Sequence, residues 1–263
     1  MKNIAVLFLP IIVLIGCDGK AFKEKKEIKN TSEIRQLDSF SELTVSNSIE
    51  LIMEKGNENV AKIETEGVDV SDVLLDVSGL ELKIKMASSI NSFWDFGFNN
   101  DKVKIRLTYV EDINSIEAQN STSVIGLTSL NTDQFELKVR NSAKTELEIN
   151  ANNVTINVSN SAKANLIVSS KVSHTKISNS GKLNIKGNTK RQTARISNSG
   201  RLNAFAFKSD TAQVKVSNSG LANISVSNTL DGYASNSGEI AYQGSPENIT
   251  VKTNNSGDIY QSK

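Results

Sequence analysis

The chain has 263 residues, and its 30 Lys and Arg against 29 Asp and Glu give no overall attraction for nucleic acids or anionic membranes. A single Cys excludes an internal disulfide, and a single His excludes a multi-histidine metal site. Aromatic residues are only 5% of the sequence, which argues against a large aromatic-rich core.

The first 16 residues have the pattern of an export signal. Lys2 supplies a positive charge, and the apolar run 4–15 is too short to span a bilayer, which needs ~20 apolar residues. The run ends in Leu14-Ile15-Gly16-Cys17, which resembles the bacterial lipobox, in which the Cys becomes the acylated first residue of the mature protein. We therefore expect a lipoprotein signal peptide over residues 1–16 and a membrane anchor on Cys17. The alternative is that Cys17 only closes a conventional signal.

Residues 17–36 are predicted to form a flexible tether behind the lipidated Cys. Positions 18–30 contain five Lys and two Glu with few apolar residues, which is typical of a solvated segment. A spacer between anchor and folded body is the simplest role, although its cations could also contact anionic headgroups.

The body of the chain is an internal repeat built on the triplet Asn-Ser-Gly or Asn-Ser-Ala. Starting from a degenerate copy at 120–122, successive serines are 21, 19, 19, 19, 20, 18 and 19 residues apart. Apolar residues alternate on both sides of each triplet, which is the period of strands with one buried face. A strand-rich unit of about 19 residues cannot bury that face alone, so the units are expected to stack as coils of a parallel β-helix. The asparagines of the seven full triplets are Asn141, Asn160, Asn179, Asn198, Asn218, Asn236 and Asn255.

We expect these asparagines to have a structural role. One Asn at the same level of every coil would stack its amide on the next in a ladder, which satisfies polar groups that are costly to bury. Gly or Ala two residues on leaves room for a bend, and Gly also permits a positive φ. The alternative is that the Asn and Ser rows form a ligand-binding stripe.

Residues 37–110 are β-rich but depart from the triplet rule. Strands are expected at 43–45, 49–53, 62–64, 80–86 and 103–109, with a short helical turn within 69–76. End coils of solenoids are atypical, so this region is predicted to form the first coils or an N-terminal cap. The regular β-helical repeats then occupy residues 111–263.

These features resemble the bacterial head GIN domain family of auto-transporter adhesins, common in Bacteroidetes. The resemblance covers 37–261 as one continuous domain, and it implies an all-β, right-handed parallel β-helix in a lipoprotein of the outer membrane. The family usually has Gly-Ser or Gly-Ala-Ser where this chain has Asn-Ser-Gly, and it has no established catalytic residues to carry over. The segments that carry it are 37–51, 55–58, 80–84, 103–109, the triplets, 242–246 and 255–259.

One local feature is a candidate partner contact. Residues 91–100 hold four aromatic side chains, Phe93, Trp94, Phe96 and Phe98, between two expected strands. An exposed loop of this kind could stack on sugars or insert into a partner. The favoured alternative is a hydrophobic lid over an open end or side of the solenoid.

The sequence offers no catalytic residues, no metal site and no cofactor motif. By strand parity His174 faces outward, Cys17 is consumed by lipid, and the acidic residues do not recur in register. Asp210-Thr211-Ala212 resembles a short O-glycosylation sequon. We expect a non-enzymatic, lipid-anchored envelope protein serving adhesion, interaction or structure, with a cell-surface glycan or protein as partner and no nucleic acid. The alternative is a glycan-binding or polysaccharide-acting envelope lipoprotein.

Overall fold

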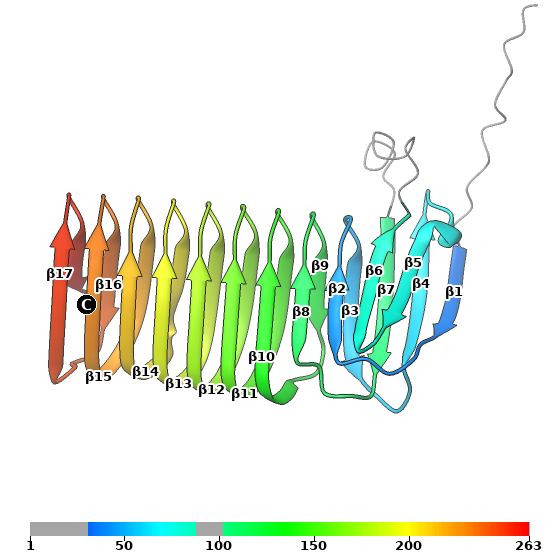
Figure 1. The fold of residues 1–263 in the computed structure, drawn as a ribbon, viewed down its shortest axis with the longest axis horizontal. Coiled ribbons are helices and arrows are strands. Elements are labelled where there is room, and N and C mark those ends of the chain that lie inside the picture. Colours follow the sequence, from blue (N-terminus) through cyan, green and yellow to red (C-terminus); the bar gives the residue numbers. More distant parts are fainter. Residues whose placement is uncertain (1–30, 88–101, 263) are drawn as a thin grey trace, which may run out of the picture.

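The computed structural model describes residues 31–87 and 102–262, so the export signal, Cys17 and the aromatic loop at 91–100 lie outside the described residues. The described chain folds as a β-solenoid whose strands belong to one 18-stranded sheet (Figure 1). This confirms the predicted all-β solenoid with coils of about 19 residues.

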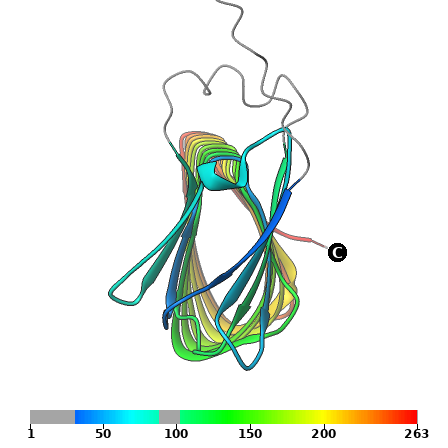
Figure 2. The same cartoon turned by 90° about the vertical axis from the view of Figure 1, so that its right-hand side faces the viewer.

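Each coil of the repeat region wraps once around a flattened core (Figure 2). Strands stack in parallel, so that residues one repeat apart pair in register; Leu147, Leu166 and Ile185, for example, align in successive coils. The strands of this region are β8 (Ser115–Ala118), β9 (Ser123–Gly126), β10 (Leu130–Val139), β11 (Lys144–Val158), β12 (Lys163–Ile177), β13 (Lys182–Ile196), β14 (Arg201–Val216), β15 (Leu221–Ser235), β16 (Glu239–Gln243), β17 (Asn248–Asn254) and β18 (Asp258–Gln261).

Two faces and two edges describe every coil. Face A consists of the strand halves that follow each Asn-Ser turn, such as 163–169, and face B of the halves that precede the next turn, such as 172–177. The turn edge carries the Asn-Ser pairs, and the far edge is the bend near 170–171, where β12 passes from face A to face B. Face B is nearer the viewer in Figure 1, with the turn edge at the top.

The Asn-Ser pairs form the turns because both residues take a left-handed backbone. Asn179 and Ser180 have φ of 49° and 60°, and the Gly181 N–H donates to the Ser178 carbonyl at 3.0 Å across them. Two consecutive positive φ values are characteristic of two-residue type I′ turns, and Asn adopts them more readily than most residues. Nine such pairs stack along the turn edge, from 47–48 in the cap to 255–256 in the last coil.

The side chains of these asparagines form an amide ladder, but at the surface rather than in the core. Nδ2 of Asn179 donates to Oδ1 of Asn160 at 3.1 Å and Nδ2 of Asn198 donates to Oδ1 of Asn179 at 3.0 Å, and all three residues are exposed. The third triplet position also differs from expectation, because Gly181 does not have a positive φ. Its lack of a side chain serves packing: a Cβ there would lie 2.6 Å from the Val158 carbonyl oxygen.

The N-terminal cap extends the solenoid with both parallel and antiparallel strands. Strands β2 and β3 form a coil that lies between β8–β9 on one side and β6–β7 on the other. Beyond it, β4 pairs antiparallel with β7, β5 with β6, and β1 with β4. The elements of the cap are β1 (Thr31–Gln36), β2 (Glu42–Val45), β3 (Glu50–Lys55), β4 (Val60–Glu66), the 3₁₀ turn η1 (Val70–Asp72), β5 (Val73–Ser78), β6 (Glu81–Met86) and β7 (Lys102–Tyr109).

Strand β1 corrects the boundary predicted for the tether. The sequence predicts residues 31–36 as the end of the flexible segment 17–36, and Ile34 is the only large apolar residue among them. They form a strand instead, since their backbone pairs with β4 along its whole length, from Thr31 opposite Thr65 to Gln36 opposite Val60. Ile34 itself is 66% exposed, so apolar burial contributes little to this strand.

Candidate functional site

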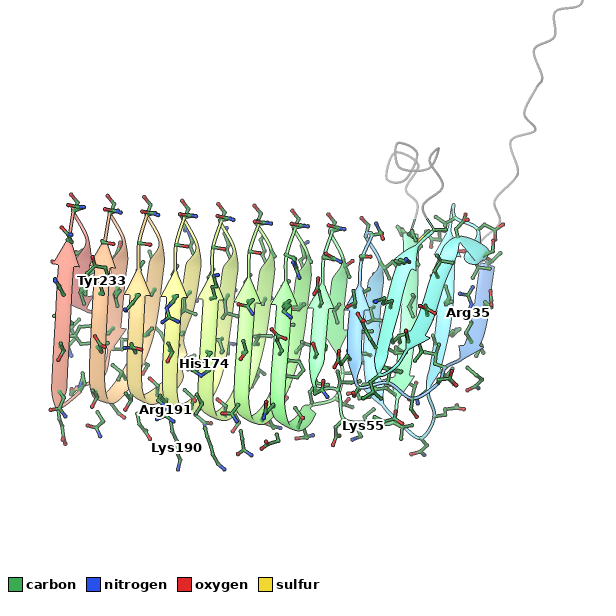
Figure 3. All side chains as sticks on the ribbon, viewed as in Figure 1. Arg35, Lys55, His174, Lys190, Arg191 and Tyr233 are labelled. Atoms are coloured by element: carbon green, nitrogen blue, oxygen red, sulfur yellow. The ribbon has the colours of Figure 1, made fainter. Side chains whose placement is uncertain are left out.

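A hollow in the described surface lies on the far edge of the middle coils. It has a volume of about 770 Å³, and Lys190 and Arg191 on its wall are labelled in Figure 3. Its two carboxylates, Asp133 and Asp210, stand four coils apart, which at the spacing of paired strands is about 19 Å. The carboxyl pairs of glycoside hydrolases are roughly 5–9.5 Å apart, so this hollow does not hold such a pair.

His174 is exposed on face B, as its parity predicts, with Thr155 and Thr193 beside it in the neighbouring coils. Among residues 31–87 and 102–262, no group of three His, Cys, Asp or Glu side chains could hold a metal ion. Within the same residues, no helix is long and apolar enough to cross a membrane. Neither His174 nor a metal cluster therefore defines a site in the described chain.

Charge is strongly segregated along the solenoid, although the whole chain is almost neutral. Residues 31–148 contain 11 Lys and Arg against 21 Asp and Glu, and residues 221–263 contain two against four. Between them, residues 149–220 contain 11 Lys and Arg and a single acidic residue, Asp210. We call these eleven cations the basic belt; they are Lys163, Lys171, Lys176, Lys182, Lys186, Lys190, Arg191, Arg195, Arg201, Lys208 and Lys215.

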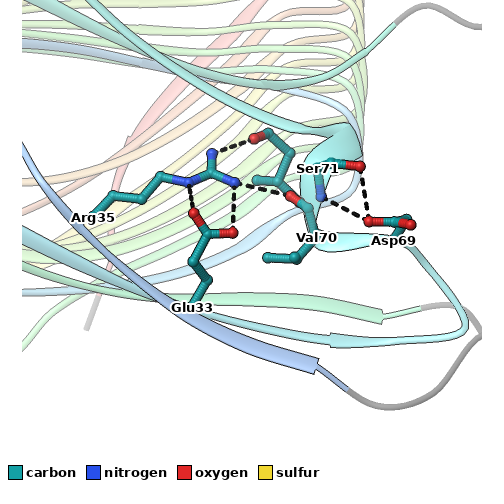
Figure 4. Close-up of polar contacts among 6 residues, drawn as sticks. Glu33, Arg35, Asp69, Val70 and Ser71 are labelled. Atoms are coloured by element: carbon teal, nitrogen blue, oxygen red, sulfur yellow. Dashed lines mark hydrogen bonds and ion pairs between the residues drawn. The ribbon is translucent and has the colours of Figure 1, made fainter.

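Many charged side chains in the cap form ion pairs. Arg35 binds both carboxylate oxygens of Glu33, at 2.8 and 3.1 Å, and donates to the backbone carbonyls of Val70 and Val73 (Figure 4). The hydrogen bond from Arg35 lowers the pKa of Glu33. Lys55 pairs with Asp112, a contact that raises the pKa of Lys55. The ion pairs of the cap lie partly within one strand, as for Glu33 and Arg35, and partly between strands, as for Lys104 of β7 and Glu50 of β3.

The basic belt contrasts with this pattern. The eight ion pairs of the described residues all lie between positions 33 and 140. Within the part of the chain that the structure describes, no member of the basic belt forms an ion pair or a side-chain hydrogen bond. The belt is therefore a surface of uncompensated positive charge.

In-register stacking arranges several of these cations into rows. On face A, three belt cations, Lys163, Lys182 and Arg201, align with Lys144 of the preceding coil; the four occupy the same position of successive coils and all are exposed. We call this row the face A ladder. On face B, Lys176, Arg195 and Lys215 align in the same way.

The basic belt was not predicted from the sequence, because whole-chain charge averages it against the acidic cap. A count of charged residues in windows of a few repeats would have revealed it. The predicted candidates lie elsewhere: the asparagines are on the turn edge, and Thr211 of the sequon is half-buried at the far-edge hollow.

The fold and surface define a β-solenoid that presents flat, charged sheet faces. The chain belongs to the family described as "Putative auto-transporter adhesin, head GIN domain", whose model matches residues 39–176 and 156–246. This agrees with the resemblance seen in the sequence. No curated protein matches the sequence.

Crystal structures of similar fold come from Bacteroidetes. A "putative adhesin" from Parabacteroides merdae has a TM-score of 0.82 at 17% identity, covering 89% of this chain and 97% of its own. A "putative adhesin" from Parabacteroides distasonis has a TM-score of 0.81 at 18% identity, covering 90% and 98%. A "putative lipid binding protein" from the same species has a TM-score of 0.80 at 21% identity, covering 89% and 97%. At these identities the likeness concerns the fold.

Proposed function

We propose that the protein is a non-enzymatic binding module of the cell envelope, anchored in the outer membrane by lipid on Cys17. The solenoid would present its sheet faces to a partner on the cell surface, in the manner of an adhesin. The observation that carries this proposal is the basic belt: eleven cations gathered on the middle coils without ion-pair partners in the described chain.

Three further features support it. The family is adhesin-like, which favours an envelope location. The lipobox-like sequence ending at Cys17 supplies an anchor, and the segment after it supplies a spacer between the membrane and β1. Flat sheet faces suit contact with an extended partner better than capture of a small molecule, because small ligands are bound mainly in concave, largely apolar sites.

A polysaccharide-acting enzyme is the weaker alternative. Such chemistry needs an acid pair, or an acid and a base, that converge on one bond. The far-edge carboxylates are too far apart for that role, and His174 stands among threonines. The aromatic residues Phe93, Trp94, Phe96 and Phe98 lie outside the described residues and stay a candidate contact with the partner, with a hydrophobic lid as the favoured alternative.

The proposal is tested by protease treatment of intact cells that produce the full chain, with detection of the C-terminal coils. We expect the coils to be digested on intact cells, and the Cys17→Ala variant to be released from the membrane fraction. Complete protection of the coils until the outer membrane is permeabilised would exclude adhesion to other cells. Retention of Cys17→Ala in the membrane fraction would exclude the lipid anchor.

A further inference from the structure

We propose that the face A ladder binds a linear anionic polysaccharide that runs along the axis of the solenoid. This inference rests on the proposed function and names the ligand class of that surface. Its first support is spacing. Lys144, Lys163, Lys182 and Arg201 pair in register across β11 to β14, so their Cα atoms follow one another at the strand spacing of about 4.8 Å and the row spans about 14 Å.

The second support is that the fold does not require cations in this row. The same position is Ser123 in the coil before the ladder, and Leu221, Glu239 and Asp258 in the coils after it. Like charges at adjacent positions of neighbouring strands repel one another, so a run of four is unfavourable for folding by itself. Since neutral or acidic residues occupy this position in the neighbouring coils, an anionic ligand is the natural explanation for the run of cations.

The third support is a parallel row of amides. Two residues after Lys163, Lys182 and Arg201, on the same face, stand Asn165, Asn184 and Asn203, and Asn223 continues this row in the next coil. The first two are joined by a hydrogen bond of 2.9 Å from Asn184 to Asn165, whereas the side chains of Asn203 and Asn223 make no hydrogen bond to the described chain. Amide groups both donate and accept hydrogen bonds, so a row of them suits the hydroxyl groups of a sugar chain.

Acidic residues limit this surface at both ends. Glu146 and Glu148 lie on face A in the first coil of the ladder, and Glu239 and Asp258 continue its row in the last coils. A polyanion would be attracted to the middle coils and repelled from the ends, which fixes the segment of the solenoid that it contacts.

Other polyanions fit this face less well. Single-stranded nucleic acids are usually held by several aromatic side chains that stack on the bases. On the ladder's coils face A offers only Phe205, which is half-buried. A membrane would favour exposed apolar side chains among the cations. Ile167 is the only large apolar residue with more than a third of its surface exposed on these coils of face A.

The test is a binding measurement with the full chain purified in a neutral detergent. The probes are polygalacturonate for carboxylates and dextran sulfate for sulfates, with uncharged dextran, single-stranded DNA and phosphatidylglycerol vesicles as comparisons. The ladder variant is Lys163→Gln with Lys182→Gln. Its matched control is Lys176→Gln with Lys215→Gln, which removes the same charge from face B of nearby coils.

We expect the wild-type chain to bind at least one anionic polysaccharide and not dextran, more weakly as salt rises. The ladder variant should lose about tenfold in affinity and the control about twofold or less, with circular dichroism unchanged in both. Equal losses in both variants, no loss in either, or tighter binding to DNA or vesicles would overturn the inference. If the coils are digested on intact cells and the ladder variant binds like wild type, the ladder assignment alone fails. If the coils are protected on intact cells, the proposed adhesive function is contradicted, whatever the binding measurement shows for the ladder.

Discussion

Asn179 shows what each turn demands of a single residue. Its backbone has φ of 49°, and its side chain takes part in two ladder hydrogen bonds, to Asn160 and from Asn198. Both properties favour Asn, since this residue tolerates the left-handed region and carries a donor and an acceptor on one short side chain. The sequence repeats Asn at every turn, so the pattern alone does not separate the two causes.

Two substitutions separate them. Asn179→Ala removes the amide and places a residue with low left-handed tolerance in the turn, so we expect a loss of about 1–3 kcal/mol in the free energy of unfolding. Asn179→Gly removes the amide but keeps the backbone freedom, and should cost about 1 kcal/mol or less. Urea unfolding followed by circular dichroism measures both. Equal losses in the two variants would show that backbone conformation is not what selects Asn.

At the scale of elements, periodicity explains most of what the sequence predicted. The 19-residue spacing and the apolar alternation identify β10 to β16 as stacked strands, because residues such as Leu166 and Ile185 repeat at the same inward position. The cap has no repeat, so its antiparallel pairs and the position of β2 and β3 between other strands could not be read from spacing.

Strand β1 could not be predicted for a different reason. This strand forms through contacts with residues distant in sequence. Its backbone pairs with β4, and Arg35 donates hydrogen bonds to the carbonyls of Val70 and Val73, at the start and just after the end of the 3₁₀ turn η1. A polar segment with one apolar residue carries no local signal for such contacts. Glu33, on the same strand, forms an ion pair with Arg35, and this pair is present only while the Glu33 carboxyl group is ionised.

We therefore expect β1 to detach first in acid. The pKa of Glu33 is lowered in the folded state by its hydrogen bond from Arg35. A carboxyl group whose pKa is lower in the folded state than in the unfolded state stabilises the folded state at pH values above its unfolded pKa. The Glu33 contribution to the stability of β1 is therefore present near neutral pH. It is lost as the pH falls below the ordinary value of 4.5 and through the pKa of the folded state. Hydrogen exchange, corrected for its intrinsic pH dependence, should show protection of residues 31–36 falling before that of β12 and β13.

Glu33→Gln is the informative variant for this prediction. It should lower the protection of β1 already at neutral pH and remove most of its acid dependence. Glu64→Gln on the adjacent β4 removes another exposed ion pair, with Lys62, and serves as the control. Acid dependence that persists in Glu33→Gln would show that another group controls the detachment.

At the scale of the whole molecule, the distribution of charge is the property that the sequence analysis missed. A net charge of +1 describes a chain in which the lysine-rich first 30 residues, an acidic cap and first coils, the basic belt and a slightly acidic end offset one another. Successive coils follow one another along the axis of the solenoid, so a segment of the sequence that is rich in cations occupies a few neighbouring coils. Its charges are then distributed around the circumference of those coils. Stacking then places the Cα atoms of like-charged residues about 4.8 Å apart, and two unit charges at such a separation repel by about 1 kcal/mol in water.

This self-repulsion predicts that salt stabilises the protein. Between 10 mM and 500 mM NaCl the Debye length falls from about 30 Å to less than 8 Å, so the belt cations repel one another less. We expect the Tm to rise by several degrees, because about 1 kcal/mol corresponds to roughly 2–4 °C for a chain of this size. The ion pairs of the cap are weakened by salt, but they are exposed and contribute roughly 0–1 kcal/mol each.

The variant Lys163→Gln with Lys182→Gln distinguishes the belt from a general salt effect. It removes two adjacent cations of the face A ladder, so its Tm at low salt should be higher than that of the wild type, and its rise with NaCl should be smaller. Calorimetry of both proteins at matched salt concentrations measures the difference. A wild-type Tm that is constant or falls with salt would mean that attraction between the basic belt and the acidic coils on either side outweighs repulsion within the belt. In that case the row of cations would contribute to folding, and its retention would no longer point to a ligand.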